Sequence, residues 1–512
     1  MGWNDAIALL PRALQPALIT AGALHVAALC FFLKRKFGLA LPLLLAGGAL
    51  LRLYFIELDP FLHDWDERFH ALVGANTGQH FLKPTLREYP LLGYSPFSWV
   101  FSHVWLHKQP LFLWQIGWSV NFFGRNEFAL RLPSAIEGVL LIAILNDLGK
   151  RLFNPETGFL AAFFFSLYHV PLDLTSGYTG MDHNDMAFCF YVTVSLWAWF
   201  RYEQSRRRGW LVLMALASGG AVLVKWLTGL LVFATYGCYH LLEGNLLTRR
   251  VMIDGVFALG ITLLAFLPWQ WYIFHHYPIE AQYEFQYNSR HFTEVLEGHA
   301  ESIGFYWKQL PSMYHHLEWV AILAMILVLL PGKNNNLHRA LIASVVGVYL
   351  FFTLAATKMW GYPLMVMPLV LLYIAYGGWL LLEKILLRRV MATVTLVLLF
   401  SLILFQPNRL LTSYFDLHTW YAPIRSAKTY NAAVMRHWTR TLPADAVVVN
   451  IPNDNELDFM FYSALPAFGT GLTEQQVNHL QDLHKKIYWV NTPPSAAWKL
   501  REPIYLLPEE IR

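Results

Sequence analysis

Three carboxylates follow an apolar run in the segment FLHDWDERFHA, at Asp64, Asp66 and Glu67. Acidic side chains next to a membrane-length apolar run are costly unless they are paired or functional. A carboxylate at such a position can act as the general base for an acceptor hydroxyl, or it can bind a metal ion. The alternative is that these residues only hydrate a surface loop.

A second acidic cluster, MDHNDMAF, precedes a later apolar run and contains Asp182 and Asp185. Residues three positions apart share one face of a helix, and His183 lies one position off that face. The structural alternative is a helix cap, with Asp182 or Asn184 as the N-cap residue. Capping accounts for one of these residues, and it does not readily account for the whole cluster.

Two lysines lie beside apolar runs, Lys108 in LHKQPLFLWQ and Lys358 in AATKMWGYP. An ammonium group at the depth of lipid headgroups can neutralise a phosphate. The alternative is an interfacial anchor whose aliphatic stem lies in the apolar layer. Lys225, in VLVKWLTG, has no comparable context and would line a cavity or mark a tight helical hairpin.

The 20 histidines include no pair with a clean metal-ligand spacing, and no P-loop or HExxH motif occurs in a suitable setting. We therefore predict no cofactor and no obligatory metal. A divalent metal remains the alternative, and His103, His107 and His183 are the residues that would form a zinc site.

These residues must be positioned by membrane helices. Of the 512 residues 56% are hydrophobic and 14% are charged, against about 25% charged in an ordinary soluble protein. This composition excludes a simple cytosolic enzyme and a disordered chain, and the net charge of +4 is too small to indicate a nucleic-acid partner.

Apolar runs predict a polytopic α-helical membrane protein with about 12 transmembrane helices. They lie near 13–33, 38–57, 132–149, 157–172, 186–202, 210–224, 227–243, 252–274, 317–331, 340–356, 363–382 and 390–406.

Lysine and arginine are distributed unevenly between the predicted connections. One set of loops contains sixteen of them, whereas the short loops of the other face contain only Lys225 and Lys358. The positive-inside rule makes the first set cytoplasmic, and an even number of spans then puts both termini outside. The outer face carries the large loops 58–131 and 275–316 and the tail 407–512.

The tail differs in composition from the membrane module of residues 1–406. Its runs AVVVN (446–450) and KIYWV (486–490) predict strands, and YNAAVMRHWTRTL predicts a helix. We therefore expect a small α/β domain over residues 407–512, outside the membrane.

Taken in order, these motifs resemble the polyprenyl-phosphate-sugar-dependent glycosyltransferases of family 39, which have the GT-C membrane fold. That family includes the protein O-mannosyltransferases and the lipid A aminoarabinose transferase. The resemblance covers roughly residues 38–380. The segments that match are Asp66-Glu67, Lys108-Gln109-Pro110 before an aromatic helix, NEFALRLPSA (126–135), the acidic pair Asp182 and Asp185, and Lys358 with Tyr362, Pro363 and Pro368.

Two features depart from the family pattern. An additional N-terminal helix precedes the usual first span, and His107 stands where some relatives carry a glutamate beside the lysine. The second departure puts a metal site at that position in doubt. The second acidic position of the family corresponds to Asp182 or to Asp185.

The resemblance implies an inverting transfer of a sugar from a polyprenyl phosphate to a hydroxyl of a lipid, glycan or protein acceptor. Asp66 would accept the proton of that hydroxyl and Glu67 would orient it. Lys358 and Lys108 would stabilise the departing phosphate, and Asp182 or Asp185 would position the donor or the acceptor. Further contacts to the substrates are expected from His107, His183 and Tyr362.

The expected location is the bacterial inner membrane, where the chain crosses several times among membrane lipids and places its active site and tail in the periplasm. A transporter or flippase of lipid-linked sugars is the alternative function. Such a protein would carry its carboxylates near the middle of the membrane on broken helices. The acidic residues here lie at the ends of predicted helices on one face, which favours the enzyme.

Overall fold

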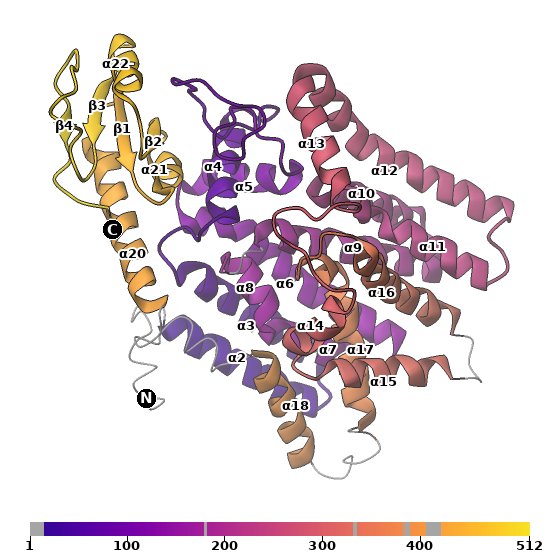
Figure 1. Cartoon of the computed structure of the whole chain (residues 1–512). Helices are drawn as coiled ribbons and strands as arrows, with labels where there is room; N and C mark the ends of the chain where they lie inside the picture. Colours follow the sequence, from indigo (N-terminus) through magenta and orange to yellow (C-terminus); the bar gives the residue numbers. More distant parts are fainter. Residues whose placement is uncertain are drawn as a thin grey trace. The chain divides into compact units, whose positions relative to one another are not determined.

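The computed structural model describes residues 15–178, 182–330, 335–381, 383, 390–405 and 421–511 (Figure 1). These residues form two compact units. Unit 1 comprises residues 56–133 and 421–511, and unit 2 comprises residues 15–55 and 134–405. The chain passes from unit 2 to unit 1 at residues 55–56 and returns to unit 2 at residues 133–134.

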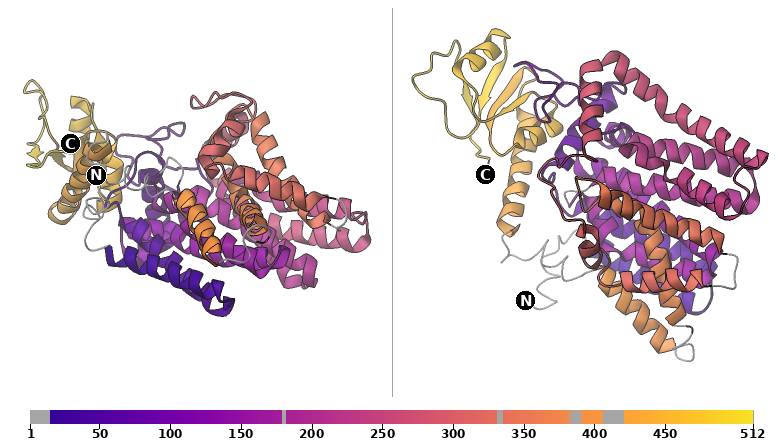
Figure 2. Two further views of the ribbon diagram at one scale, coloured as in Figure 1. Left: turned by 90° about the horizontal axis from the view of Figure 1, so that it is seen from below. Right: turned by 45° about the vertical axis from the view of Figure 1, so that its right-hand side comes forward.

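The described part of unit 2 is helical, as expected of a chain whose backbone groups must pair internally within a membrane. In the views of Figures 1 and 2, α10, α11 and α12 lie side by side, and α10 packs against both α9 and α12. The helices are α2 (Gln15–Leu33), α3 (Phe37–Glu57), α6 (Glu127–Leu152), α7 (Pro155–Leu167), α8 (His169–Ser176), α9 (His183–Ser205), α10 (Arg208–Lys225), η1 (Trp226–Leu230), α11 (Leu231–Leu242), α12 (Arg249–His276), α13 (Pro278–Arg290), α14 (Phe305–Tyr314), α15 (Glu318–Leu329), α16 (Asn336–Leu354), η2 (Tyr362–Val366), α17 (Met367–Leu381) and α18 (Val390–Phe405).

The chain is a multi-pass membrane protein, but the prediction of about 12 spans is corrected. By length and composition, seven helices of the described residues can cross a membrane, or nine if two bent helix pairs each form one span. The helix α18 has only 16 described residues, and α9 is too polar because it contains charged residues such as Asp185, Arg201 and Glu203. The predicted spans 210–224 and 227–243 both map to one candidate, Arg208–Leu242.

The chain folds back on itself inside this last candidate. Ser218 Oγ donates a hydrogen bond to the carbonyl of Gly229 at 2.9 Å, although the two residues are 11 positions apart. In a straight helix they would be separated by about 16 Å along the axis. A Cβ added at Gly229 would lie 2.6 Å from the amide nitrogen of Val222, so glycine permits this close approach. Lys225 ends α10 at the turn, which confirms the predicted tight hairpin.

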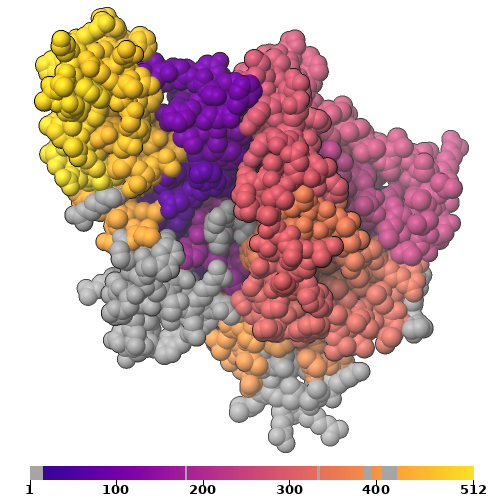
Figure 3. Space-filling view, in the orientation of Figure 1, coloured from indigo at the N-terminus to yellow at the C-terminus, as the bar shows by residue number. Residues whose placement is uncertain are grey.

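Unit 1 combines two helices of the first large loop with a small α/β region, shown in yellow and orange in Figures 1 and 3. Its four strands are all parallel, in the order β2-β1-β3-β4. The helices are α4 (Asp66–Gln79), α5 (Leu111–Phe123), α20 (Tyr421–Thr441), α21 (Asn455–Ser463) and α22 (Glu474–Asp482), and the strands are β1 (Ala446–Ile451), β2 (Ala467–Gly469), β3 (Lys486–Trp489) and β4 (Tyr505–Leu506).

The structure confirms both predicted strands, as β1 and β3, and the predicted helix, as α20. Strands β1 and β3 are neighbours, with Val447 paired to Ile487. Their apolar side chains form one core with Phe468 of β2 and with Val477 and Leu480 of α22. The predicted domain boundary at 406–407 lies outside the described residues.

Polar contacts join the first large loop to the α/β region within unit 1. The guanidinium of Arg87 donates to the carbonyl of Ala467 at 2.8 Å, and Arg436 Nη2 lies 2.5 Å from Glu127 Oε1. Leu91 and Leu92 pack against the apolar core of the sheet. Residues of the first large loop and of the tail therefore share one folding unit.

Candidate active site

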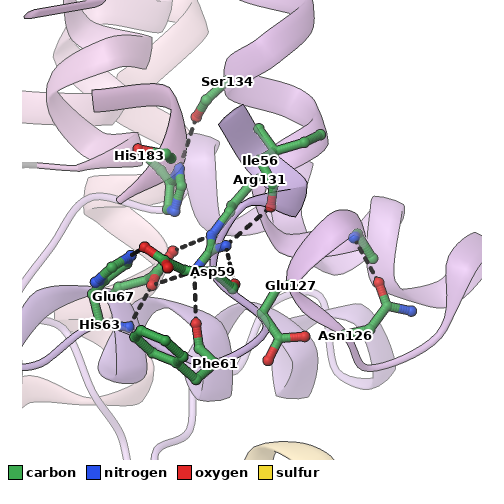
Figure 4. Close-up of polar contacts among 12 residues, drawn as sticks. Ile56, Asp59, Phe61, His63, Glu67, Asn126, Glu127, Arg131, Ser134 and His183 are labelled. Atoms are coloured by element: carbon green, nitrogen blue, oxygen red, sulfur yellow. Dashed lines mark hydrogen bonds and ion pairs between the residues drawn. The ribbon is translucent and has the colours of Figure 1, made fainter. Parts of the chain in front are cut away.

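Glu67 forms a buried ion pair with Arg131 at the start of α4 (Figure 4). Arg131 Nε donates to Glu67 Oε1 at 2.7 Å and Nη2 donates to Oε2 at 3.0 Å, while the amide of His63 donates to Oε2 at 2.6 Å. Both carboxylate oxygens thus accept hydrogen bonds. The guanidinium also donates to the carbonyl of Ile56 near the end of α3 and to the carbonyls of Asp59 and Phe61 in the turn before α4. Glu67 is therefore placed to hold this turn, and with it the first residue of α4.

We expect Glu67→Ala to lower the free energy of unfolding by about 3–5 kcal/mol, because it leaves the buried charge of Arg131 without its partner. Thermal unfolding of the purified variant would measure this. The matched control is Glu294→Ala, which removes an exposed partner of Arg290 and should cost less than about 1 kcal/mol. Equal losses in the two variants would contradict a positioning role for Glu67.

Asp66 and Lys108 form the second feature of this part of unit 1. Asp66 is the first residue of α4, where the helix dipole favours negative charge. Lys108 Nζ lies 3.7 Å from Asp66 Oδ2 and 5.5 Å from the ring centre of Trp99. Both side chains are partly exposed, at 18% for Asp66 and 24% for Lys108. The pair therefore presents a carboxylate and an ammonium group side by side to the surroundings.

A histidine that the sequence analysis did not select lies one turn along α4 from Asp66. His70 offers a ring nitrogen within 4.8 Å of a carboxylate oxygen of Asp66. The sequence WDERFHA already indicated this pairing, because Asp66 and His70 are four positions apart and such residues share a helix face. Within unit 1 this carboxylate–imidazole pair offers two ligands of the kind that zinc accepts.

The other histidines considered for a metal make different contacts. His107 stacks on Trp99 with ring centres 4.2 Å apart and meets Trp105 edge-on. His103 Nδ1 donates to the carbonyl of Arg87 at 2.6 Å. One ring nitrogen of His103 is thus already used within the protein.

The acidic cluster of unit 2 divides into residues with different roles. Asp182 is the N-cap residue of α9 and accepts a hydrogen bond from the amide of Asn184 at 3.1 Å, which confirms the capping alternative for this residue. His183 Nδ1 lies 3.0 Å from Ser134 Oγ (Figure 4). Both Asp182 and His183 are buried.

Asp185, on the first turn of α9, forms an ion pair with Lys225. The ammonium of Lys225 also lies 5.6 Å from the ring centre of Tyr362 at the start of η2. The structure therefore brings together two predicted site residues, Asp185 and Tyr362, through a lysine that the sequence analysis left without a function. Two features of the sequence pointed to Lys225: its position at a hairpin between apolar runs, and its place as one of only two basic residues in the short loops of the face predicted to lie outside.

Lys358 is a buried lysine, with 7% of its surface exposed. Its ammonium donates to the carbonyl of Ala355 at 2.6 Å, and within the described residues it has no carboxylate within 4 Å. The neighbouring backbone is fixed by residues 291–299, since the amide of Thr357 donates to the carbonyl of His291 at 3.0 Å. A lysine that anchors its helix at the membrane surface would expose its ammonium group to water. The burial of Lys358 therefore argues against the interfacial anchor.

The fold is that of the GT-C membrane glycosyltransferases. The protein is similar to ArnT from Cupriavidus metallidurans, solved bound to undecaprenyl phosphate, with a TM-score of 0.61 and 18% identity over 86% of both chains. It is also similar to the archaeal oligosaccharyltransferase AglB from Archaeoglobus fulgidus, with a TM-score of 0.54 and 13% identity over 83% of this chain and 63% of that chain.

Sequence comparison finds similarity to sugar transferases over part of the chain. Residues 107–272 match the profile of the dolichyl-phosphate-mannose-protein mannosyltransferases. An undecaprenyl phosphate-alpha-4-amino-4-deoxy-L-arabinose arabinosyl transferase of Pseudomonas fluorescens is 26% identical over 313 residues, which is 59% of this chain and 52% of that protein. A second transferase of that name, from Pseudomonas paraeruginosa, is 29% identical over 186 residues, 34% of this chain and 32% of that protein. The chain is thus similar, over part of its length, to the family that its motifs resemble, and it spans about half the length, or less, of these curated relatives.

Proposed function

We propose that the protein transfers a sugar from a polyprenyl phosphate to an acceptor hydroxyl, with inversion at the anomeric carbon. The acceptor is a lipid, a glycan or a protein. The observation that carries this proposal is the pair of Asp66 and Lys108, with 3.7 Å between carboxylate and ammonium. It supplies a proton acceptor and a cation at one place in a chain whose relatives are named as transferases of undecaprenyl-phosphate-linked sugars.

In this reaction the acceptor oxygen forms a bond to the anomeric carbon while the bond from that carbon to the phosphate oxygen breaks. The electron pair of the broken bond leaves with the phosphate, and Asp66 takes the proton of the acceptor hydroxyl. Lys358 and Lys108 stabilise the negative charge that develops on the leaving phosphate. The donor already carries the free energy for transfer, so no nucleotide takes part in this step.

The remaining predicted residues position the groups that react. Glu67 holds the turn before Asp66 through Arg131. Asp185 and Lys225 orient Tyr362 toward the substrates, and Asp182 fixes the first turn of α9, which carries His183. His107 extends the aromatic stack beside Lys108.

A transporter or flippase of lipid-linked sugars is supported less well. Asp66 is the first residue of α4 and Asp182 is the N-cap of α9, so both carboxylates stand at helix ends and not in the middle of a span. Mass spectrometry of envelope glycolipids and glycoproteins, with and without the gene, tests the proposal. One class of molecule should lose a single sugar in the deletion strain and regain it with the wild-type gene but not with Asp66→Asn. A flippase would instead deplete every product of the lipid-linked sugar.

The proposed location is the bacterial inner membrane, with the active site and residues 407–512 in the periplasm. We expect a cysteine at Ala496, an exposed position of the tail, to be labelled by an impermeant maleimide in intact spheroplasts. The background for this experiment replaces Cys30, Cys189 and Cys238 by serine.

A cysteine at Gly209 is the matched control, because it is exposed at the start of α10 among the arginines predicted to face the cytoplasm. It should be labelled only after the membrane is permeabilised. The reverse pattern would refute the proposed orientation.

A further inference from the structure

An open pocket of ≈ 510 Å³ lies in unit 2 at the ends of three helices, and none of the residues assigned to glycosyl transfer lines it. Arginines supply most of its lining: Arg206 after α9, Arg208 at the start of α10, and Arg249 and Arg250 at the start of α12. The remaining lining residues are Tyr202, Ile253 and Asp254. Four guanidinium groups therefore surround a space large enough for a small polar group.

The protein neutralises only part of this positive charge. Arg206 Nη2 lies 2.7 Å from Glu203 Oε2, and Arg250 Nε lies 3.8 Å from Asp254 Oδ2, an oxygen that also accepts a hydrogen bond from Tyr202. In contrast, Arg208 and Arg249 have no carboxylate within 4 Å in the part of the chain that the structure describes. Two guanidinium groups are thus left for an anion from outside.

The backbone at the same place also favours an anion. Arg208 and Arg249 are the first residues of α10 and α12, and neither helix has a side-chain cap: Arg207 and Thr248, the N-cap residues, make no capping hydrogen bond. The amide groups at the start of a helix lack partners within the helix, and the helix dipole is positive at this end. Two such ends beside unpaired arginines form a site suited to a phosphate group.

The surface next to the pocket is apolar. On the first turns of α12, Met252, Ile253, Val256 and Phe257 are between 45% and 65% exposed. In a membrane-spanning helix such a surface faces lipid tails. The pocket therefore lies where the headgroups of the bilayer meet the ends of its helices.

We propose that this pocket binds the phosphate group of an anionic phospholipid headgroup, as a site separate from the one for the sugar donor. Arg208 and Arg249 hold the phosphate oxygens, while Arg206 and Arg250 remain paired within the protein. The general tendency of arginine to collect on one side of a membrane would place these residues near headgroups, but it does not require them to line a common pocket.

The test measures lipid binding by native mass spectrometry of the purified full chain in detergent. Phosphatidylglycerol should bind more tightly than phosphatidylcholine, and Arg208→Gln/Arg249→Gln should weaken phosphatidylglycerol binding about tenfold or more. The matched control is Lys34→Gln/Lys36→Gln, which removes two charges from exposed positions of the α2–α3 loop and should leave this affinity unchanged. Equal thermal unfolding of the two variants checks that both are folded.

Experiments with inorganic phosphate distinguish a lipid headgroup from a soluble phosphate compound as the ligand of the pocket. If millimolar phosphate displaces phosphatidylglycerol only weakly, the headgroup is the ligand. If phosphate binds the wild type and not Arg208→Gln/Arg249→Gln, and the lipid shows no preference, the pocket is a phosphate site that serves a soluble phosphate compound. Equal losses of lipid in the arginine variant and the lysine control, or no binding of lipid or phosphate, would overturn the proposal.

Discussion

Asp66→Asn is expected to abolish sugar transfer while the protein remains folded. Asparagine has nearly the same shape as aspartate, but its amide cannot accept the proton of the acceptor hydroxyl. Loss of a general base lowers turnover by about 10²–10⁴-fold. Initial rates of the purified variant with a saturating polyprenyl-phosphate sugar measure the effect, and thermal unfolding reports on the fold.

Asp64→Asn provides the matched control for this experiment. Asp64 lies two residues away in the same loop, with its side chain 65% exposed and paired with Arg68 and Lys428. Its loss removes two ion pairs of an exposed carboxylate, but the buried guanidinium of Arg68 keeps Asp458 as a partner at 3.2 Å, so turnover should stay near that of the wild type. Turnover of Asp66→Asn close to the wild-type value would remove Asp66 from the proposed mechanism.

The sequence predicted those elements whose signal lies within a few residues. The short run of β-branched residues in AVVVN identified β1, and the polar-apolar pattern of YNAAVMRHWTRTL identified α20. Strands β2 and β4 were missed because three and two residues are too short to show a period. The cap at Asp182 was also recognisable, since capping depends only on the next few residues.

Contacts between distant residues could not be predicted in this way. Lys225 pairs with Asp185, 40 positions earlier, and Arg131 pairs with Glu67, 64 positions earlier. Each pairing depends on how helices pack, and a single sequence carries no record of that packing. The same reason explains why Arg87, in the first large loop, was not connected with Ala467 of the tail.

Hydropathy alone does not show how much of an apolar helix faces lipid, because apolar runs report on burial as well as on contact with lipid. In the helical segment Tyr362–Leu381, 78% of the apolar stretch long enough to cross a membrane is buried inside the protein. In Arg249–His276 the corresponding share is 22%. Both are apolar enough to cross a membrane. Hydropathy therefore locates such helices but does not distinguish those that face lipid from those that face protein.

Lys358→Ala is expected to weaken binding of the polyprenyl-phosphate donor and to slow departure of the phosphate. The ammonium of Lys358 is buried, and its one acceptor among the described residues is the carbonyl of Ala355, so two of its N–H groups can bind an incoming anion. A hydrogen bond to a charged group contributes about 1.5–3 kcal/mol, so the dissociation constant of the donor should rise about tenfold to a hundredfold. Turnover should fall as well, because negative charge on the phosphate increases in the transition state.

Lys358→Arg and Lys308→Ala make this experiment specific. Arginine keeps the positive charge with a different geometry, so Lys358→Arg should retain part of the donor affinity. Lys308 is exposed on α14, and its loss should leave both constants unchanged. A lysine that serves only as a membrane anchor would behave differently, since Lys358→Ala would then lose some stability and keep its donor affinity and turnover. Donor titrations and initial rates of the three variants in detergent therefore decide whether Lys358 binds the phosphate or only holds its loop at the membrane.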